Sequence, residues 1–95
     1  MGGGNSPPLI FKNKNMLDEI IEYFQDEEFL IADGFNDAII GVDESSMRII
    51  YSEKKCIYIL MEQGLTQEEA MEFFDFNVKG SHLGDQTPIW CCDLF

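Results

Sequence analysis

The sequence predicts an α+β fold, in which an antiparallel β-hairpin or small sheet is covered on one face by about three helices. Two observations predict it. Residues 38–43 and 47–51 are two apolar, strand-like runs joined by short polar residues, as in a hairpin. The segments on either side carry helical periodicity with start signals. Because an isolated hairpin is marginal in water, we expect these helices to pack against it.

The first run of the hairpin alternates apolar and mixed positions, which predicts that Ile40 and Val42 share the buried face. The polar residues 43–46 favour a turn. The second run is rich in β-branched and aromatic residues, and it places Ile49 in the core.

A first helix is expected to begin after Asn15 as N-cap and to end near residues 25–28. Its apolar face follows the helical repeat and predicts four core residues, Leu17, Ile20, Ile21 and Phe24. Residues 29–32 are a candidate for a short strand.

A second helix is expected over residues 53–63 with Ser52 as N-cap, and a third over 67–78. Thr66 and Glu69 have the spacing of a capping box. The predicted buried residues of these helices are Ile57, Leu60, Phe73 and Phe74. Residues 89–91 are a candidate closing strand, and the single tryptophan, Trp90, is expected to anchor them to the core.

The chain length indicates one domain over residues 15–95, preceded by a flexible arm at 1–14 that is rich in Gly and Pro. We expect no membrane span and no signal peptide, because no apolar run is long enough. Three cysteines, two of them adjacent, do not make a disulfide framework, and a reducing cytoplasm is the expected compartment.

The charge is strongly acidic, with a net charge of −12. Residues 16–47 hold ten acidic side chains and no Lys or Arg. This argues against binding nucleic acid, which requires cations at the phosphates, and against anionic membranes. The sequence instead predicts a non-enzymatic module that binds a basic protein surface, unless the acidity serves only solubility. The residues expected to contact such a partner are Asp18, Glu19, Glu22, Asp43 and Glu44.

No catalytic residue, metal or cofactor is predicted. The candidates weighed for a zinc site or a Cys–His nucleophile are Cys56, His82, Cys91 and Cys92. Adjacent cysteines suit a zinc tetrahedron badly, and no residue is identified that would orient the histidine. The oxygen ligands Asp33, Asn36 and Asp37 lack the spacing of a calcium-binding loop.

Two alternatives stay open. In the first, a small ligand-binding protein or enzyme uses the loops 33–37 and 77–88, with Asp33, Asp37, Asn77 and His82 at the site. In the second, the chain is a structural homodimer that binds no ligand. Residues 80–84 contain two glycines but lack the Lys-Ser/Thr that follows a phosphate-binding loop. No sugar-binding aromatic residues are organised around the paired carboxylates Glu68 and Glu72 of the third helix.

Several short motifs resemble a group of small uncharacterised acidic proteins found in phages, prophages and bacteria. They are Asp33-Gly34-Phe35-x-Asp37-Ala38, Ile40-Gly41, Arg48-x-x-Tyr51, Lys55-Cys56-Ile57, Phe76-Asn77-x-x-Gly80 and Gly84-x-x-Thr87-Pro88. The resemblance covers about residues 31–90. It implies a cytoplasmic setting on a mobile element and no known activity. Where an aromatic residue is expected after Gly80, this chain has Ser81-His82, so the resemblance does not support a catalytic histidine.

Overall fold

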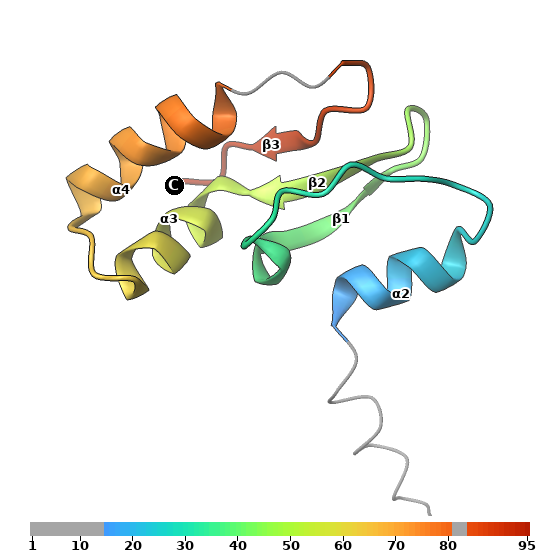
Figure 1. Ribbon diagram of the computed structural model, residues 1–95, viewed down its shortest axis with the longest axis horizontal. Coiled ribbons are helices and arrows are strands. Elements are labelled where there is room, and N and C mark those ends of the chain that lie inside the picture. Colours follow the sequence, from blue (N-terminus) through green and yellow to red (C-terminus); the bar gives the residue numbers. More distant parts are fainter. Residues whose placement is uncertain (1–14, 81–83) are drawn as a thin grey trace, which may run out of the picture.

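The computed structural model describes residues 15–80 and 84–95, and in this part of the chain a three-stranded mixed sheet packs with three α-helices (Figure 1). The protein therefore has the α+β fold that the sequence predicts. The strands are β1 (Ile39–Asp43), β2 (Arg48–Ser52) and β3 (Ile89–Cys91). The helices are α2 (Met16–Tyr23), α3 (Glu53–Glu62) and α4 (Gln67–Phe73), with a 3-10 turn η1 (Asn36–Ala38) and a π-helix η2 (Phe74–Lys79).

The sheet has the order β1-β2-β3, with β1 and β2 forming the predicted antiparallel hairpin. β3 pairs with β2 in parallel and places Trp90 opposite Tyr51. Parallel neighbours need a long crossover, which α3, α4 and η2 supply here. The closing strand 89–91 is thus confirmed, while its parallel direction is set by the two intervening helices.

A β-bulge in β1 changes which isoleucine is buried. Ile39 lies opposite Tyr51, but Gly41 lies opposite Ile50, so Ile40 is the extra residue. Ile39 is 2% exposed and Ile40 is 38% exposed. The prediction that Ile40 is a core residue is therefore wrong, because the bulge shifts the alternation by one position. Val42 returns to register opposite the buried Ile49.

The predicted helix starts are confirmed. The Asn15 side chain accepts a hydrogen bond from the Asp18 amide at 2.9 Å, and Ser52 Oγ accepts from the Lys55 amide at 3.1 Å. Thr66 and Glu69 form the reciprocal capping box. The first helix ends at Tyr23, earlier than expected.

Residues 29–32 form no strand. The Ala32 amide instead donates to the buried Tyr51 hydroxyl at 2.8 Å, which fastens this segment to the sheet.

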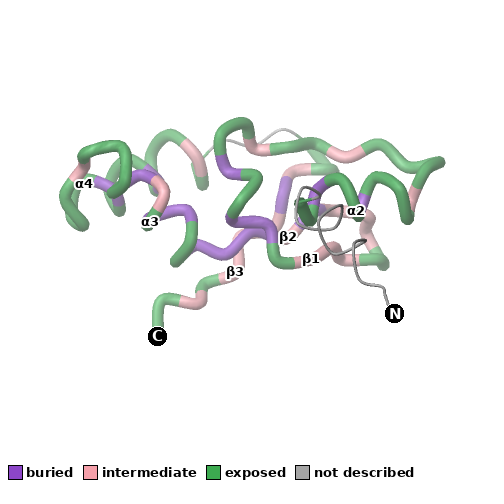
Figure 2. The backbone as a smooth tube through the Cα atoms, turned by 90° about the horizontal axis from the view of Figure 1, so that it is seen from below, coloured by how far each residue is buried: buried purple, intermediate pink, exposed green. Residues whose placement is uncertain are grey.

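All three helices contribute to one core, which lies on one side of the sheet together with the segment that leads from α2 to β1 (Figure 2). Besides Ile40, two further predicted core residues are exposed, Ile21 at 46% and Phe73 at 44%. Ile21 lies beside the narrow buried stripe of Leu17 and Ile20.

The third helix buries Ala70 and Phe74, with Val78 packed against the core one turn further on. This stripe repeats every four residues, because the helix widens into η2, and Phe73 is left outside it. Phe74 meets the Trp90 ring edge to face at 5.4 Å. The predicted anchoring of the closing strand by Trp90 is thus confirmed.

Among residues 15–80 and 84–95, no helix has the length and apolar composition needed to cross a bilayer. The arm predicted at residues 1–14 lies outside the described residues.

Candidate functional site

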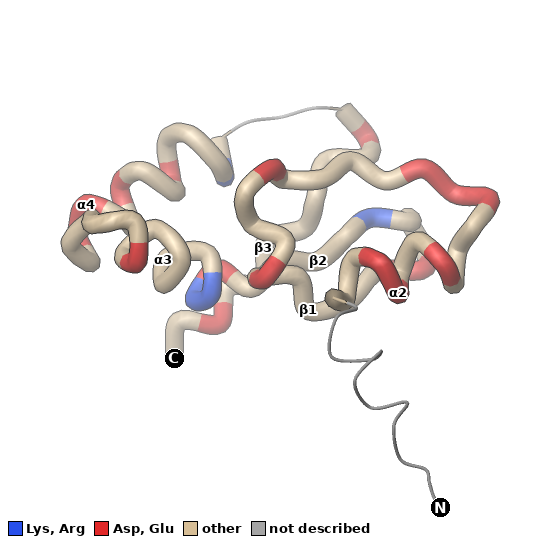
Figure 3. The backbone as a smooth tube through the Cα atoms, turned by 60° about the horizontal axis from the view of Figure 1, so that its bottom comes forward, with Lys and Arg blue, Asp and Glu red and all other residues tan. Residues whose placement is uncertain are grey.

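One end of the molecule carries the acidic segment predicted from the sequence. α2, the segment that follows it and the hairpin turn all contribute Asp and Glu there (Figure 3). We call this region the acidic end and define it by its exposed carboxylates: Asp18, Glu19, Glu22, Asp26, Glu27, Glu28 and Glu44. Four of the five predicted partner-binding residues are exposed on it.

The fifth, Asp43, holds the hairpin turn. Its carboxylate accepts from the hydroxyls of Ser46 at 2.7 Å and Ser45 at 2.9 Å, and from the Ser45 amide at 3.3 Å. The hydrogen bond from Ser46, followed by that from Ser45, lowers the pKa of Asp43 below its ordinary value. The Asp43 carboxylate is therefore engaged in hydrogen bonds that stabilise the hairpin turn.

Arg48 directly follows the acidic segment 16–47 in sequence, and its side chain is hydrogen-bonded within the fold. Its Nε donates to Ser46 Oγ at 3.1 Å, and its Nη1 donates to the Thr87 carbonyl at 3.3 Å. These bonds tie the hairpin to the segment before β3. Within residues 15–80 and 84–95, the basic side chain next to the acidic end in sequence is therefore held in place by the fold, and it keeps its positive charge.

Apolar side chains lie among the carboxylates of α2. Ile21 is 46% exposed and Tyr23 is 73% exposed, with the Tyr23 ring stacked on Phe24 at 4.7 Å. The helical repeat predicted burial for Ile21 because it adjoins the buried stripe. The combination of an acidic rim with exposed apolar residues is a feature that sequence reasoning missed.

The two loops of the alternative ligand site meet at a pocket of about 210 Å³. Asp33 and Asn77 both line it, although they are distant in sequence. The remaining walls are mostly apolar: Ile31, Ala32, Phe35, Val78, Pro88 and Trp90. Asp37 does not line the pocket, and His82 lies outside the described residues.

A tight turn positions Asp33 at this pocket. Gly34 has φ +93°, a backbone conformation that a side chain would strain, and the Phe35 amide donates to the Ala32 carbonyl at 3.1 Å. On the other side, η2 presents Asn77 and Val78. A π-helical segment is rare and frequently occurs at functional sites.

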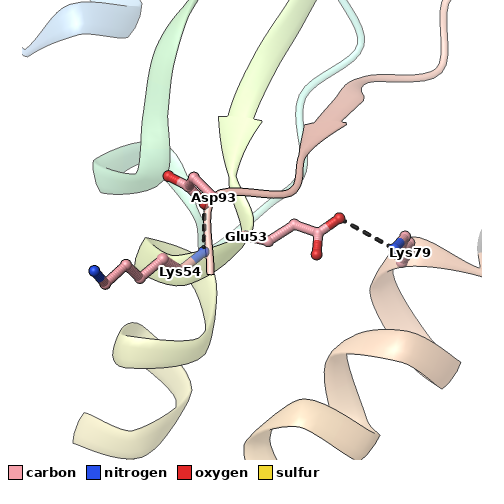
Figure 4. Close-up of polar contacts among 4 residues, drawn as sticks. All are labelled: Glu53, Lys54, Lys79 and Asp93. Carbon is pink, nitrogen blue, oxygen red and sulfur yellow. Dashed lines mark hydrogen bonds and ion pairs between the residues drawn. The ribbon is translucent and has the colours of Figure 1, made fainter. Parts of the chain in front are cut away.

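Two carboxylates organise the junction between β2, α3 and the C-terminal segment (Figure 4). Glu53, only 4% exposed, lies 3.1 Å from Lys79 Nζ, and hydrogen bonding to Glu53 is the first cause of the raised pKa of Lys79. Asp93 accepts from Ser52 Oγ at 2.5 Å and from the Lys54 amide at 3.0 Å. These contacts join α3 to η2 and to the C-terminal segment, so their role is structural.

The three cysteines lie in different surroundings, and His82, the histidine weighed as a partner for Cys91 or Cys92, lies outside the described residues. Cys56 is buried in the core, and burial, followed by the charges of Glu53 and Asp93, raises the pKa of its thiol to about 12. A thiol with that pKa stays protonated and unreactive near neutral pH. Cys91 is half-buried and Cys92 exposed. Within the described residues, no three His, Cys, Asp or Glu side chains gather as they would around a metal ion.

No family model, no curated protein and no solved structure matches this chain. The resemblance to small phage and bacterial proteins therefore stays a prediction.

The hydrogen bonds to Asp93 predict acid sensitivity. The bond from Ser52, followed by that from the Lys54 amide, lowers the pKa of Asp93 in the folded state. Between the folded and unfolded pKa values the unfolded chain binds more protons, so this contribution to stability is lost as pH falls through the folded pKa. We expect Asp93→Asn to reduce the slope of unfolding free energy against pH between roughly pH 5 and pH 2. Urea titrations at several pH values measure it, with Asp85→Asn as control; equal slopes in both variants would contradict the assignment.

Proposed function

We propose that the protein is a non-enzymatic interaction module whose acidic end binds a basic protein surface. The observation that carries the proposal is the exposure of Ile21 and Tyr23 among the carboxylates of α2. Large apolar residues are also exposed on other elements, and those on α2 differ because they lie in the segment 16–47, which contains no Lys or Arg. Protein interfaces combine buried aromatic and aliphatic contacts with a polar rim, and this helix presents both.

Acidic residues also lie on α4, so acidity by itself does not single out the acidic end. Two features distinguish it. Residues 16–47 contain ten acids and no base, and the adjacent Arg48 is bonded within the fold. Such a field accelerates encounter with a cationic partner, while the apolar contacts slow dissociation.

The resemblance described above supplies a setting for this proposal. A module carried by a mobile element would meet basic proteins of its host, including those that bind nucleic acid. Carboxylates displayed on a helix imitate the charge of phosphates. Inhibition of such a host protein by charge mimicry is the form of the proposal that this setting favours.

Site-specific photo-crosslinking tests where the partner binds. p-Benzoylphenylalanine replaces Tyr23 in one bait and Phe76, which is 83% exposed on η2, in a matched bait. After irradiation in host lysate, we expect the bait labelled at position 23 to capture a basic protein that the bait labelled at 76 does not. Identical adducts from both baits, or no adduct enriched at 23, would contradict the proposal.

A second candidate function is supported by the pocket that joins Asp33 and Asn77. Its size suits a ligand smaller than most drugs, and its carboxylate favours a neutral or cationic molecule with an N–H donor. Because Trp90 lines the pocket and is the single tryptophan, its fluorescence reports occupancy. A fragment library of small amines and amides tests this. We expect hits whose fluorescence change is lost in Asp33→Asn and kept in Asp37→Asn; hits that ignore both substitutions would argue against the pocket.

A further inference from the structure

We propose that a groove between α3 and α4 binds an amphiphilic anion that carries a single negative charge and belongs to the fatty-acid class. The groove encloses about 720 Å³. It is lined by Lys54, Lys55, Ile57, Tyr58, Met61, Gln67, Met71 and Leu94. It is distinct from both the acidic end and the pocket at Asp33, so this inference goes beyond the proposed function.

The groove follows a helical stripe. Lys54, Tyr58 and Met61 recur along one face of α3 with the spacing of successive turns. Gln67 and Met71 face them from α4, one turn apart, and Leu94 adds an apolar wall from the C-terminal segment. The groove between the two helices is therefore lined mostly by apolar side chains, with the two lysines at the end where α3 begins.

Most apolar side chains of the groove are exposed to solvent, and only Ile57 among them is buried. Tyr58 is 63% exposed, and Met61 and Met71 are each 38% exposed. Methionine is unbranched and flexible, so two methionines facing one another adapt to a chain of methylene groups. The volume falls within the range of small-molecule sites, which are predominantly apolar with few charged groups.

The charge at the mouth of the groove is unusual for this protein. Of the four bases among the described residues, Arg48 bonds to the Thr87 carbonyl and Lys79 pairs with Glu53. The other two, Lys54 and Lys55, both lie at the groove. The Lys54 ammonium points away from Glu53 and Lys79 (Figure 4). The Lys54 backbone amide already donates a hydrogen bond to the Asp93 carboxylate. An anionic head group would therefore be bound by the side-chain ammonium groups of Lys54 and Lys55.

The same charge distribution limits the ligand to one negative charge. The chain as a whole carries −12, so each charge beyond the one placed at Lys54 and Lys55 is repelled by the surrounding surface. An acidic peptide helix carries several charges and little continuous apolar length. A monocarboxylate with an alkyl chain places its one charge at the lysines and its chain along the methionines.

Dodecanoate, held below its critical micelle concentration, is the probe that tests the site on the full chain. The readout is the NMR shift of the methionine methyl groups, assigned with Met61→Leu and Met71→Leu. We expect saturable shifts at Met61 and Met71 and none at Met16 or Met47, which lie outside the groove. Dodecyltrimethylammonium has the same chain and a positive head, and the acidic surface attracts it at other places, so only the shifts of Met61 and Met71 are compared. At these two residues we expect it to bind at least tenfold more weakly than dodecanoate.

The matched variants separate local from overall charge. Lys54→Gln with Lys55→Gln is expected to weaken dodecanoate binding about tenfold. The control, Gln25→Glu with Gln86→Glu, makes the same change in net charge at exposed positions outside the groove and should leave the affinity within about twofold. The proposal would be overturned if both double variants lost the same dodecanoate affinity, or if the cationic detergent bound equally well at Met61 and Met71. Shifts spread over all methionines would overturn it as well. Shifts of Met61 and Met71 that depend on protein concentration alone would assign the groove to a second copy and overturn it too.

Discussion

Phe74→Ala is expected to lower the free energy of unfolding by about 3–5 kcal/mol. Phe74 is 1% exposed and packs edge to face on Trp90, where the helical layer meets β3. Truncation leaves a cavity between η2 and the sheet, and it removes the contact that holds the third strand. Urea denaturation followed by circular dichroism measures the loss.

The neighbouring Phe73 provides the control. It is 44% exposed, and we expect Phe73→Ala to cost less than about 1 kcal/mol. The two substitutions remove the same atoms from adjacent positions of one helix. Similar losses at both positions would contradict the four-residue stripe of Ala70, Phe74 and Val78.

Ile39→Ala is expected to cost about 2–4 kcal/mol, because Ile39 is 2% exposed and packs in the core. Ile40→Ala should cost about 1 kcal/mol or less, since this side chain is 38% exposed beside the bulge. The same equilibrium denaturation compares them. A larger loss at Ile40 than at Ile39 would show that β1 runs without the bulge, with its alternation in the opposite phase.

Local signals predicted the elements of this fold well. Asn15, Ser52 and Thr66 cap their helices as their side-chain chemistry indicates. The hairpin turn lies at residues 44–47, one residue later than the predicted 43–46. Each of these signals depends only on three or four neighbouring residues in the sequence. That is why helix starts and the hairpin follow from the sequence.

Features that depend on contacts between residues far apart in the chain were not predicted from the sequence. Periodicity shows which residues share a face but not how wide the buried stripe is, so Ile21 and Phe73 were assigned to the core. The bulge at Ile40 is a mismatch between two strands, and its local sign within β1 is Gly41, because a glycine inside a strand often marks a bulge. The parallel direction of β3 is fixed by the route of the chain through α3 and α4.

The candidate sites show the same difference between features set by local sequence and features set by contacts between distant segments. Exposed acids on α2 could be predicted because the apolar stripe directs them outward, whereas Asp43 has a structural role through its serine neighbours. The alternative site predicted from the sequence combined the loops of Asp33 and Asn77, and both residues line the pocket, whereas Asp37 of the same prediction does not. The Glu53–Lys79 pair and the α3–α4 groove join distant segments, and no pattern within either segment indicates them.

The most direct test of the central proposal is the association rate of the partner captured at position 23, measured against salt concentration. The acidic-end variant is Glu19→Lys with Glu44→Lys, and the control variant is Glu62→Lys with Glu72→Lys. All four positions are exposed, and the two variants change the net charge by the same amount. We expect the acidic-end variant to associate about tenfold more slowly at low salt and to lose most of its salt dependence. The control should stay near wild type. Equal rates for the two variants, or rates that do not respond to salt in any of the three proteins, would contradict a partner site at the acidic end.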